Sequence, residues 1–118
     1  MARILLVDDD PDQLEVRALV LEAEGHQVAS ARSRRRAVSA FRRSTPEIVL
    51  MDLRLPRTED GVALIDELRA LSATVPIIVL SGWPDDIKNH PSLPLVSEVL
   101  PKPVRTQHLL RHIRRLTA

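Results

Sequence analysis

Three short, wholly apolar runs constrain the fold of this chain more than any other feature. Each run stops abruptly at a polar residue; the pairs are residues 4–7 with Asp8, residues 48–51 with Asp52, and residues 77–80 with Ser81. A run of this length is too short for a buried helix, and it lacks the alternation of a strand with one wet face. Strands covered on both faces explain the runs best, and such strands are typical of parallel sheets.

Helical spacing of apolar residues marks the segments between these strands. Asp10 and Pro11 predict the start of the first helix, because Asp caps free N–H groups and proline suits the first helical position. Gly25 predicts where this helix ends. Weaker patterns predict two further strands, at 28–31 and 96–100, and further helices at 33–43, from Asp60-Gly61 to 71, at 84–90 and at 104–116.

Strand and helix signals alternate along the whole chain, which predicts an α/β fold with a parallel sheet and helices on both faces. The length of 118 residues is typical of one domain, and no linker or repeat interrupts it, so residues 1–118 are expected to form a single doubly wound unit. Pro84, Pro91 and Pro94 predict that the fourth helix is short or irregular. Only 2% of the residues are aromatic, so the core must be aliphatic.

Composition excludes several classes of function. The chain has no cysteine, which rules out disulfides, zinc–thiolate sites and thiol catalysis. Its formal net charge of +1 does not by itself indicate nucleic acid or a membrane as partner. No apolar run approaches the roughly 20 residues that span a bilayer, and the first residues read as a strand and not as a signal peptide. A cytoplasmic protein is expected.

Polar side chains at the ends of the predicted strands form the informative pattern. Asp8, Asp9, Asp52, Ser81 and Lys102 each lie at or just past the carboxyl end of a strand. In open parallel sheets, ligands bind in the crevice outside those ends. A single Asp at such a place is often only a turn or cap residue, as we expect for the residue that opens the first helix. The whole set points instead to a shared site.

The residue types in this set suit phosphoryl chemistry at a metal ion. Clustered carboxylates repel one another unless a cation lies among them, and oxygen ligands without Cys or His favour a hard ion such as Mg²⁺. An Asp can attack phosphorus and form an acyl phosphate. A Lys and the metal would neutralise the charge on the transferring group, and a Ser hydroxyl would donate a hydrogen bond to it.

Five stretches of the chain together resemble the receiver domain of two-component response regulators. They are ILLVDDDP (4–11), IVLMDLRLP (48–56), DG (60–61), VPIIVLSG (75–82) and LPKP (100–103). Each stretch is weak alone, but their order and spacing are specific and cover essentially the full length. The resemblance implies five parallel strands in the flavodoxin-like order 2-1-3-4-5, with five helices.

The resemblance also implies roles for individual residues. Asp52 is the expected phosphoryl acceptor and a metal ligand. Asp9 is the expected main carboxylate ligand of Mg²⁺, with Mn²⁺ as an alternative ion. Asp8 would hold the waters of the metal or bind it less directly, and the backbone carbonyl of Arg54 would complete the protein ligands.

Two further residues complete the expected machinery. Ser81 would contact a phosphoryl oxygen and move with it, and Lys102 would pair with Asp52 or its phosphate. Lys102-Pro103 is expected to be a cis peptide bond. The implied donor is a histidine kinase or a histidine phosphotransferase domain, and small phosphodonors can replace it. Such a chain catalyses only its own phosphorylation and dephosphorylation, so it is no conventional enzyme; its downstream effector is not identified by the sequence.

The chain departs from the family pattern at three places. Val99 stands where the family usually has a Tyr or Phe that turns inward when the switch residue moves. The segment 56–60 is one residue longer than the usual spacing, and the fourth helix is eroded by prolines. We therefore expect that phosphorylation chemistry survives while transmission of the signal is unusual.

The sequence leaves two interpretations open for each of three features: Trp83, the Arg54 side chain and the arginine-rich runs. Trp83 either shields the phosphate or merely covers its loop, and the Arg54 side chain either reaches the rim of the site or is solvated. The arginine-rich runs either bind an anionic partner or are solvated helix faces; without interleaved aromatic residues they give no sign of nucleic-acid binding. The runs are Arg32, Arg34, Arg35, Arg36, Arg42 and Arg43, and Arg105, Arg111, Arg114 and Arg115.

Two other functions compete with the phosphoacceptor switch. A Mg²⁺-dependent phosphatase of the haloacid-dehalogenase kind would need a second Asp two residues after the nucleophile, where this chain has Arg54. Asp8 and Asp10 have that spacing, but Asp10 is better explained as the helix cap. A binding module that keeps the fold without phosphorylation is the other alternative, and Val99 and the altered fourth helix favour it. The chain is either a stand-alone regulator or a domain of a larger protein.

Overall fold

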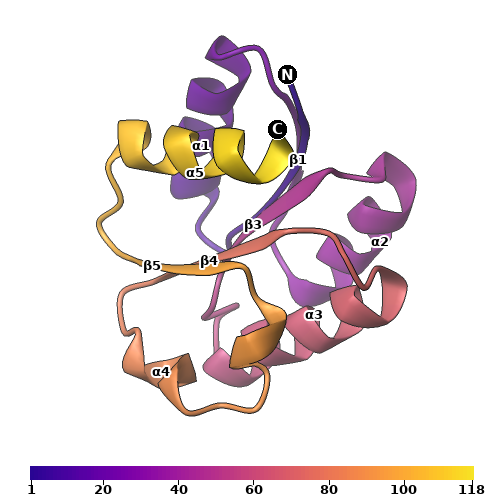
Figure 1. Ribbon diagram of the computed structural model, residues 1–118, viewed down its shortest axis with the longest axis vertical. Helices are drawn as coiled ribbons and strands as arrows, with labels where there is room; N and C mark the ends of the chain where they lie inside the picture. Colours follow the sequence, from indigo (N-terminus) through magenta and orange to yellow (C-terminus); the bar gives the residue numbers. More distant parts are fainter.

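The computed structural model describes residues 1–118 and places the five strands in one parallel sheet of order β2-β1-β3-β4-β5 (Figure 1). The strands are β1 (Arg3–Val7), β2 (Gln27–Ala31), β3 (Ile48–Asp52), β4 (Ile77–Ser81) and β5 (Glu98–Pro101). The helices are α1 (Pro11–Ala23), α2 (Arg34–Ser44), α3 (Thr58–Leu71), α4 (Asp85–Lys88) and α5 (Thr106–Thr117), and a 3₁₀ turn, η1, covers Leu93–Leu95. The predicted fold class and strand order are confirmed.

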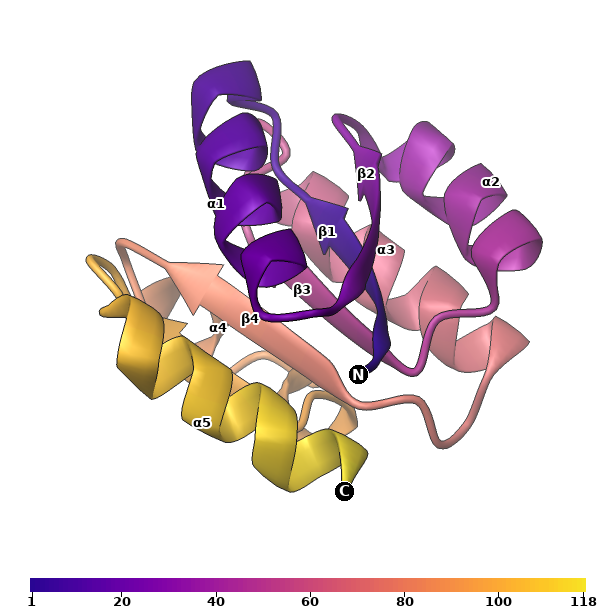
Figure 2. The ribbon, with the colours of Figure 1, turned by 90° about the horizontal axis from the view of Figure 1, so that it is seen from above.

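Helices cover the sheet on both faces, α1 and α5 on one and α2 and α3 on the other (Figure 2). The central strands supply side chains to both layers in alternation: Leu5 and Val7 of β1 face the α2–α3 side, while Ile4 and Leu6 face the α1–α5 side. Every residue of β3 is buried. This two-sided burial is the physical reason why the strand reads as a continuous apolar run.

The first helix begins as the sequence predicts. The carboxylate of Asp10 accepts hydrogen bonds from the backbone N–H groups of Asp12 (2.9 Å) and Gln13 (3.4 Å), and Pro11 is the first helical residue. Gly25 follows the helix with a φ of +91°, a left-handed conformation that favours glycine. Asp10 therefore serves as the helix cap, whereas Asp8 and Asp9 lie in the acidic cluster at the end of the sheet.

The third helix begins at Thr58, two residues before the predicted start at Asp60-Gly61, so that prediction is wrong. Asp60 lies inside the first turn, where its carboxylate accepts a hydrogen bond from the backbone N–H of Arg57 at 3.4 Å. Position 61 requires glycine because α3 packs closely against the loop after β3. A Cβ at this position would lie 1.7 Å from the carbonyl oxygen of Leu53. The glycine marks close packing and not a helix boundary.

The fourth helix is reduced to the four residues Asp85–Lys88, shorter than the predicted 84–90. Pro94 lies in the separate turn η1, and β5 begins at Glu98 and not at residue 96. Ile87 alone anchors α4 in the core, with 1% of its surface exposed. The expectation of a short, irregular fourth helix is confirmed. No helix in the structure is both long enough and apolar enough to cross a bilayer.

Candidate phosphoacceptor and metal site

The register of the sheet brings the predicted site residues to one edge. Val7 pairs with Met51, so Asp8 and Asp52 follow side by side on neighbouring strands. On the other side of β3, β4 ends with Ser81, which pairs with Pro101 of β5. Residues from four separate segments of the chain therefore meet at the carboxyl ends of β1, β3, β4 and β5, at the place where open α/β sheets bind ligands.

Three carboxylates form the centre of this site. Asp8, Asp9 and Asp52 each offer an oxygen, and these atoms all lie within 4.8 Å of one another. Asp8 and Asp52 are buried, with 1% and 7% of their surface exposed, while Asp9 is half-buried. Charges of one sign this close, and this far from water, destabilise the site unless a cation offsets them.

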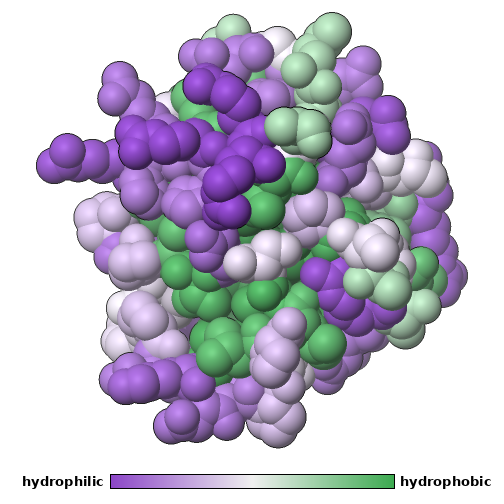
Figure 3. Space-filling model, in the orientation of Figure 1, coloured by the Kyte–Doolittle hydropathy of each residue, from purple (hydrophilic) through white to green (hydrophobic).

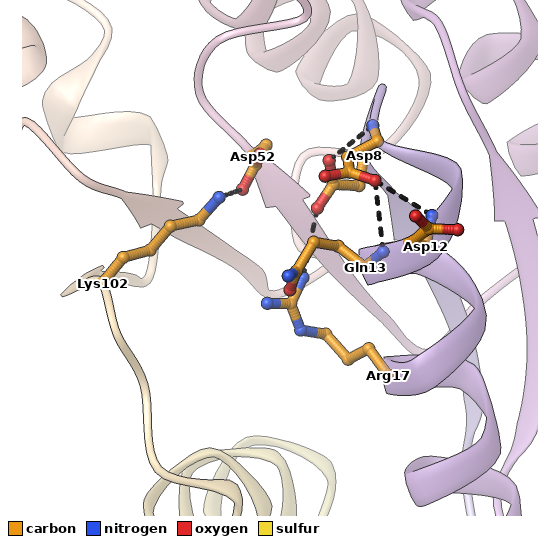
Figure 4. A network of polar contacts seen from close by, with 7 residues as sticks. Asp8, Asp12, Gln13, Arg17, Asp52 and Lys102 are labelled. Carbon is orange, nitrogen blue, oxygen red and sulfur yellow. Dashed lines mark hydrogen bonds and ion pairs between the residues drawn. The ribbon is translucent and has the colours of Figure 1, made fainter.

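Lys102 supplies one positive charge to the cluster. Its Nζ lies 2.5 Å from Oδ1 of Asp52, and Figure 4 shows the side chain reaching across from the end of β5. Its backbone N–H donates to the carbonyl of Ser81 at 2.8 Å, which holds the two strand ends together. The Lys102-Pro103 peptide bond is cis, as expected, and so is Leu55-Pro56.

The charge balance still disfavours the ionised form of Asp52. The pKa of its carboxyl group is raised from 3.8 to about 6, because burial and the charge of Asp8 raise it by more than the contact with Lys102 lowers it. Beyond the ion pair with Lys102, the buried Oδ1 of Asp52 accepts no hydrogen bond. The carboxylate is thus incompletely compensated by protein groups alone.

A small hard cation fits this arrangement. The three candidate ligands all offer carboxylate oxygen, without nitrogen or sulfur, and this is the donor set that suits Mg²⁺. The burial of Asp52 and the charge of Asp8 beside it, which both raise the pKa of Asp52, are the features that such an ion would relieve. Neither the role of the Arg54 carbonyl as a ligand nor the rank of Asp9 over Asp8 is tested by the structure, and both stay predictions.

Asp8 is held by protein groups that the sequence did not reveal. Its Oδ1 accepts a hydrogen bond from the N–H of Asp10 at 2.9 Å, and its Oδ2 lies 3.4 Å from Nη1 of Arg17 (Figure 4). Arg17 comes from the middle of α1, two helical turns after the cap, and only 17% of its side chain is exposed. These contacts leave Asp9 as the less engaged carboxylate of the pair.

Ser81 is buried beside the acidic residues. Its Oγ accepts a hydrogen bond from the backbone N–H of Trp83 at 3.0 Å, and no acceptor engages its own hydroxyl hydrogen. The hydroxyl is therefore free to donate to a group bound at the strand ends, as its predicted role requires.

A second polar cluster borders the site and joins the loop after β3 to α4. The guanidinium of Arg54 stacks on Trp83, with Cζ 3.8 Å from the ring centroid, and its Nε donates to Asp86 at 2.8 Å. Thr58 also donates to Asp86, at 3.0 Å. These contacts lower the pKa of the Asp86 carboxyl group. Asp86 and Thr58 were missed by sequence reasoning because nothing local to either residue shows that these two loops meet.

The structure also places three features that the sequence singled out: Trp83, Val99 and the arginines of α2. Trp83 is exposed, and it covers Arg54 instead of being buried over the acidic residues. Val99 is half-buried against the core layer formed with α2 and α3. Strand β5 has no aromatic residue that could turn inward at this place. The arginines of α2 are exposed, and Arg34 pairs with Glu67 of α3 at 3.3 Å, so the solvated face and the anionic partner both stay predictions for this run.

Comparison with known proteins agrees with the fold and identifies the family. The family model of the response regulator receiver domain matches residues 4–114. A CpxR homolog of Haemophilus influenzae, a transcriptional regulatory protein, is 32% identical over 97% of this chain and 49% of its own length. The DNA-binding response regulator MtrA of Mycolicibacterium smegmatis is 40% identical over 72% of this chain and 36% of its own length. The chain thus spans about half or less of these curated relatives.

The solved structures that resemble this chain also include response regulators. A response regulator receiver domain protein from Clostridium thermocellum superposes with a TM-score of 0.89 at 25% identity, covering 99% of this chain and 94% of the other. The response regulator TrrA from Thermotoga maritima, solved in complex with Mg²⁺–BeF, superposes with a TM-score of 0.87 at 25% identity, covering 98% and 99%.

The doubly wound fold, the acidic residues and lysine at the carboxyl edge of the sheet, and the family match together define a class of signalling domain. The chain belongs to the response regulator receiver domain family of two-component systems.

Proposed function

We propose that Asp52 accepts a phosphoryl group from a histidine kinase or histidine phosphotransferase domain in a Mg²⁺-dependent reaction. The observation that carries this proposal is the convergence of Asp8, Asp9 and Asp52 within 4.8 Å, with Nζ of Lys102 at 2.5 Å from Asp52. No structural role in a small domain requires three buried or half-buried carboxylates at one point, because their repulsion lowers stability.

In the proposed reaction, a carboxylate oxygen of Asp52 attacks the phosphorus, and the bond from phosphorus to the donor nitrogen or oxygen breaks. The raised pKa, about 6, leaves the group ionised at neutral pH and more nucleophilic than an ordinary Asp. Mg²⁺, held by the three Asp residues, would supply charge neutralisation at the transferred group. Lys102 would balance the added charge, and the hydroxyl of Ser81 would donate to a phosphoryl oxygen.

The switch that follows is proposed to run through the second polar cluster, because Val99 provides no inward-turning ring. When the whole Ser81 side chain rotates to bring its hydroxyl to the phosphoryl group, Oγ moves away from the N–H of Trp83 and this hydrogen bond is lost. Trp83 stacks on Arg54, and Arg54 holds Asp86 of α4. This chain of contacts connects the phosphorylation site to a helix that only Ile87 anchors in the core.

The competing proposal is a module that signals through protein contacts without phosphorylation. Val99 and the four-residue α4 favour it. A phosphatase has less support, because Arg54 occupies the place of the second Asp and Asp10 is engaged as a cap. In each case we propose a cytoplasmic location and an output through protein contacts, with no nucleic-acid binding by this domain alone.

Incubation with a small phosphodonor, with and without Mg²⁺, followed by intact-mass measurement tests the proposal. We expect one added phosphoryl group, in the presence of Mg²⁺ only. Asp52→Asn should abolish the added mass, whereas the matched control Asp12→Asn, on the exposed first turn of α1, should keep it. Absence of added mass with every donor would favour the binding module, and turnover of a generic phosphate ester would favour the phosphatase.

A further inference from the structure

A pair of histidines lies on α5, outside the cluster of three carboxylates that forms the phosphorylation site. His108 and His112 are one helical turn apart, and their Nε2 atoms are 3.2 Å from each other. His108 is exposed, and 17% of the side chain of His112 is exposed. Figure 3 shows hydrophilic residues gathered over α5.

The spacing of the two nitrogens suits chelation. First-row divalent metals bind imidazole nitrogen at about 2.0–2.1 Å, so two nitrogens on one tetrahedral ion lie about 3.3 Å apart. The 3.2 Å between the two Nε2 atoms matches this separation, so the rings must turn their lone pairs toward the ion but need not move apart. Two histidines at positions i and i+4 of a helix also form the metal-binding pair of known zinc sites.

The carboxylate of Glu98 lies beside the ring of His112. Oε1 of Glu98, on β5, lies 3.5 Å from Nδ1 of His112, and Arg115 contacts both Glu98 (3.1 Å) and that same Nδ1 (3.0 Å). Metal-binding histidines commonly donate their second ring N–H to a carboxylate, which fixes the tautomer and makes the ligand nitrogen more basic. Glu98 is placed to accept that hydrogen bond.

We propose that His108 and His112 form a binding site for Zn²⁺ or a similar imidazole-preferring divalent ion such as Ni²⁺ or Cu²⁺. Without metal, Nδ1 of His112 accepts from Arg115, and its Nε2–H donates to Nε2 of His108. On binding, the proton of His112 moves from Nε2 to Nδ1 and is donated to Glu98, so both Nε2 lone pairs face the ion and no net proton is released. Arg115 keeps its contact with Glu98.

This site differs from the acidic one in the ion that it selects. Imidazole nitrogen favours Zn²⁺, Ni²⁺ and Cu²⁺ over Mg²⁺, whereas the Asp residues favour Mg²⁺. Arg115, with Nη2 at 3.0 Å from Nδ1 of His112, is too close for salt to screen, and its charge is offset by Glu98 at 3.1 Å. The bound ion would brace one turn of α5 and tie it to β5 through Glu98.

Titration of tag-free protein with Zn²⁺ in excess Mg²⁺, followed by calorimetry, tests the site. We expect one Zn²⁺ per chain, and imidazole ¹⁵N signals that report coordination through Nε2 of both rings. His112→Asn should weaken binding at least tenfold, and Glu98→Gln about tenfold, because the carboxylate acts through the ring. Phosphorylation of Asp52 should be unchanged in both variants, so the two proposals stand or fall separately.

A matched control keeps the number of imidazoles and changes only their spacing. His108→Asn combined with Gln107→His separates the two rings by five residues, which places them on different sides of the helix. This double variant should bind Zn²⁺ at least tenfold more weakly than the unaltered chain, with the same helix content by circular dichroism. Equal affinity of the two proteins would overturn the proposal, and so would wild-type binding that Mg²⁺ abolishes.

Discussion

The guanidinium of Arg54 lies between two partners, with the Trp83 ring 3.8 Å from its Cζ on one face and the Asp86 carboxylate 2.8 Å from its Nε. Arg54 is two residues beyond Asp52, and Trp83 is two residues beyond Ser81. The two loops that border the acidic site are therefore joined to each other and to α4 by one side chain. We therefore expect a group bound at Asp52 to act on this cluster through both loops.

The fluorescence of Trp83 should report occupation of the site. It is the only Trp, and the chain has no Tyr, so the signal is free of other emitters. We expect its emission to change when Mg²⁺ and beryllofluoride bind, because Ser81 would then release the N–H of Trp83. Asp86→Asn should alter the emission of the unbound protein by weakening the hold on Arg54, whereas Asp85→Asn, the exposed neighbour, should not. An emission unchanged at saturating ligand would contradict the coupling.

Asp52→Asn should stabilise the metal-free domain in a pH-dependent way. Below pH 3.8 the Asp52 carboxyl group is protonated in both the folded and the unfolded chain, so its charge has no effect. As the pH rises from 3.8 to about 6, the unfolded chain loses this proton first, and the folded state is progressively disfavoured. The two pKa values correspond to a full cost of up to about 3 kcal/mol above pH 6.

Urea denaturation in the presence of a chelator measures this effect. The variant should exceed the wild type in free energy of unfolding by about 1–3 kcal/mol more at pH 8 than at pH 4. Addition of Mg²⁺ should raise the stability of the wild type more than that of the variant, because the ion offsets the Asp52 charge. A difference between the two proteins that stays constant with pH would contradict the burial argument.

Lys102→Gln should separate metal binding from phosphoryl transfer. The ammonium group competes with a cation for Asp52, so its removal should increase Mg²⁺ affinity several-fold and raise the pKa of Asp52 above about 6. Phosphorylation should nevertheless become slower by roughly tenfold or more, because one positive charge is missing beside the transferred group. Calorimetry with Mg²⁺ and a time course of intact mass check the two effects. Weaker Mg²⁺ binding would show that the lysine positions the acidic residues.

Gly61→Ala should destabilise the domain strongly. Alanine is normally the better helix former by about 1 kcal/mol, but here its Cβ would lie 1.7 Å from the carbonyl oxygen of Leu53, which must move. We expect a loss of about 3 kcal/mol or more in the free energy of unfolding. Gly82→Ala is the control, since an added Cβ there would meet no atom within 4 Å, and it should change stability by less than about 1 kcal/mol. Similar losses for both variants would contradict this packing argument.

The strands, and the edge of the sheet at which the site forms, are encoded locally in the amino-acid sequence. A strand buried on both faces must be apolar at every position, so the runs that end at Asp8, Asp52 and Ser81 were readable without knowledge of their neighbours. Parallel pairing then forces the carboxyl ends of such strands to one side. The cap at Asp10 was equally local, because a cap and its partners lie within three residues.

Contacts between segments that are distant along the chain arise only in the folded arrangement. The start of α3 depends on how closely Gly61 approaches Leu53, and the state of Asp8 depends on Arg17, which reaches it from the middle of α1. Arg54 finds Asp86 thirty-two residues away. No local period or propensity encodes such meetings, because they follow from the paths of loops and the reach of long side chains once the sheet has formed.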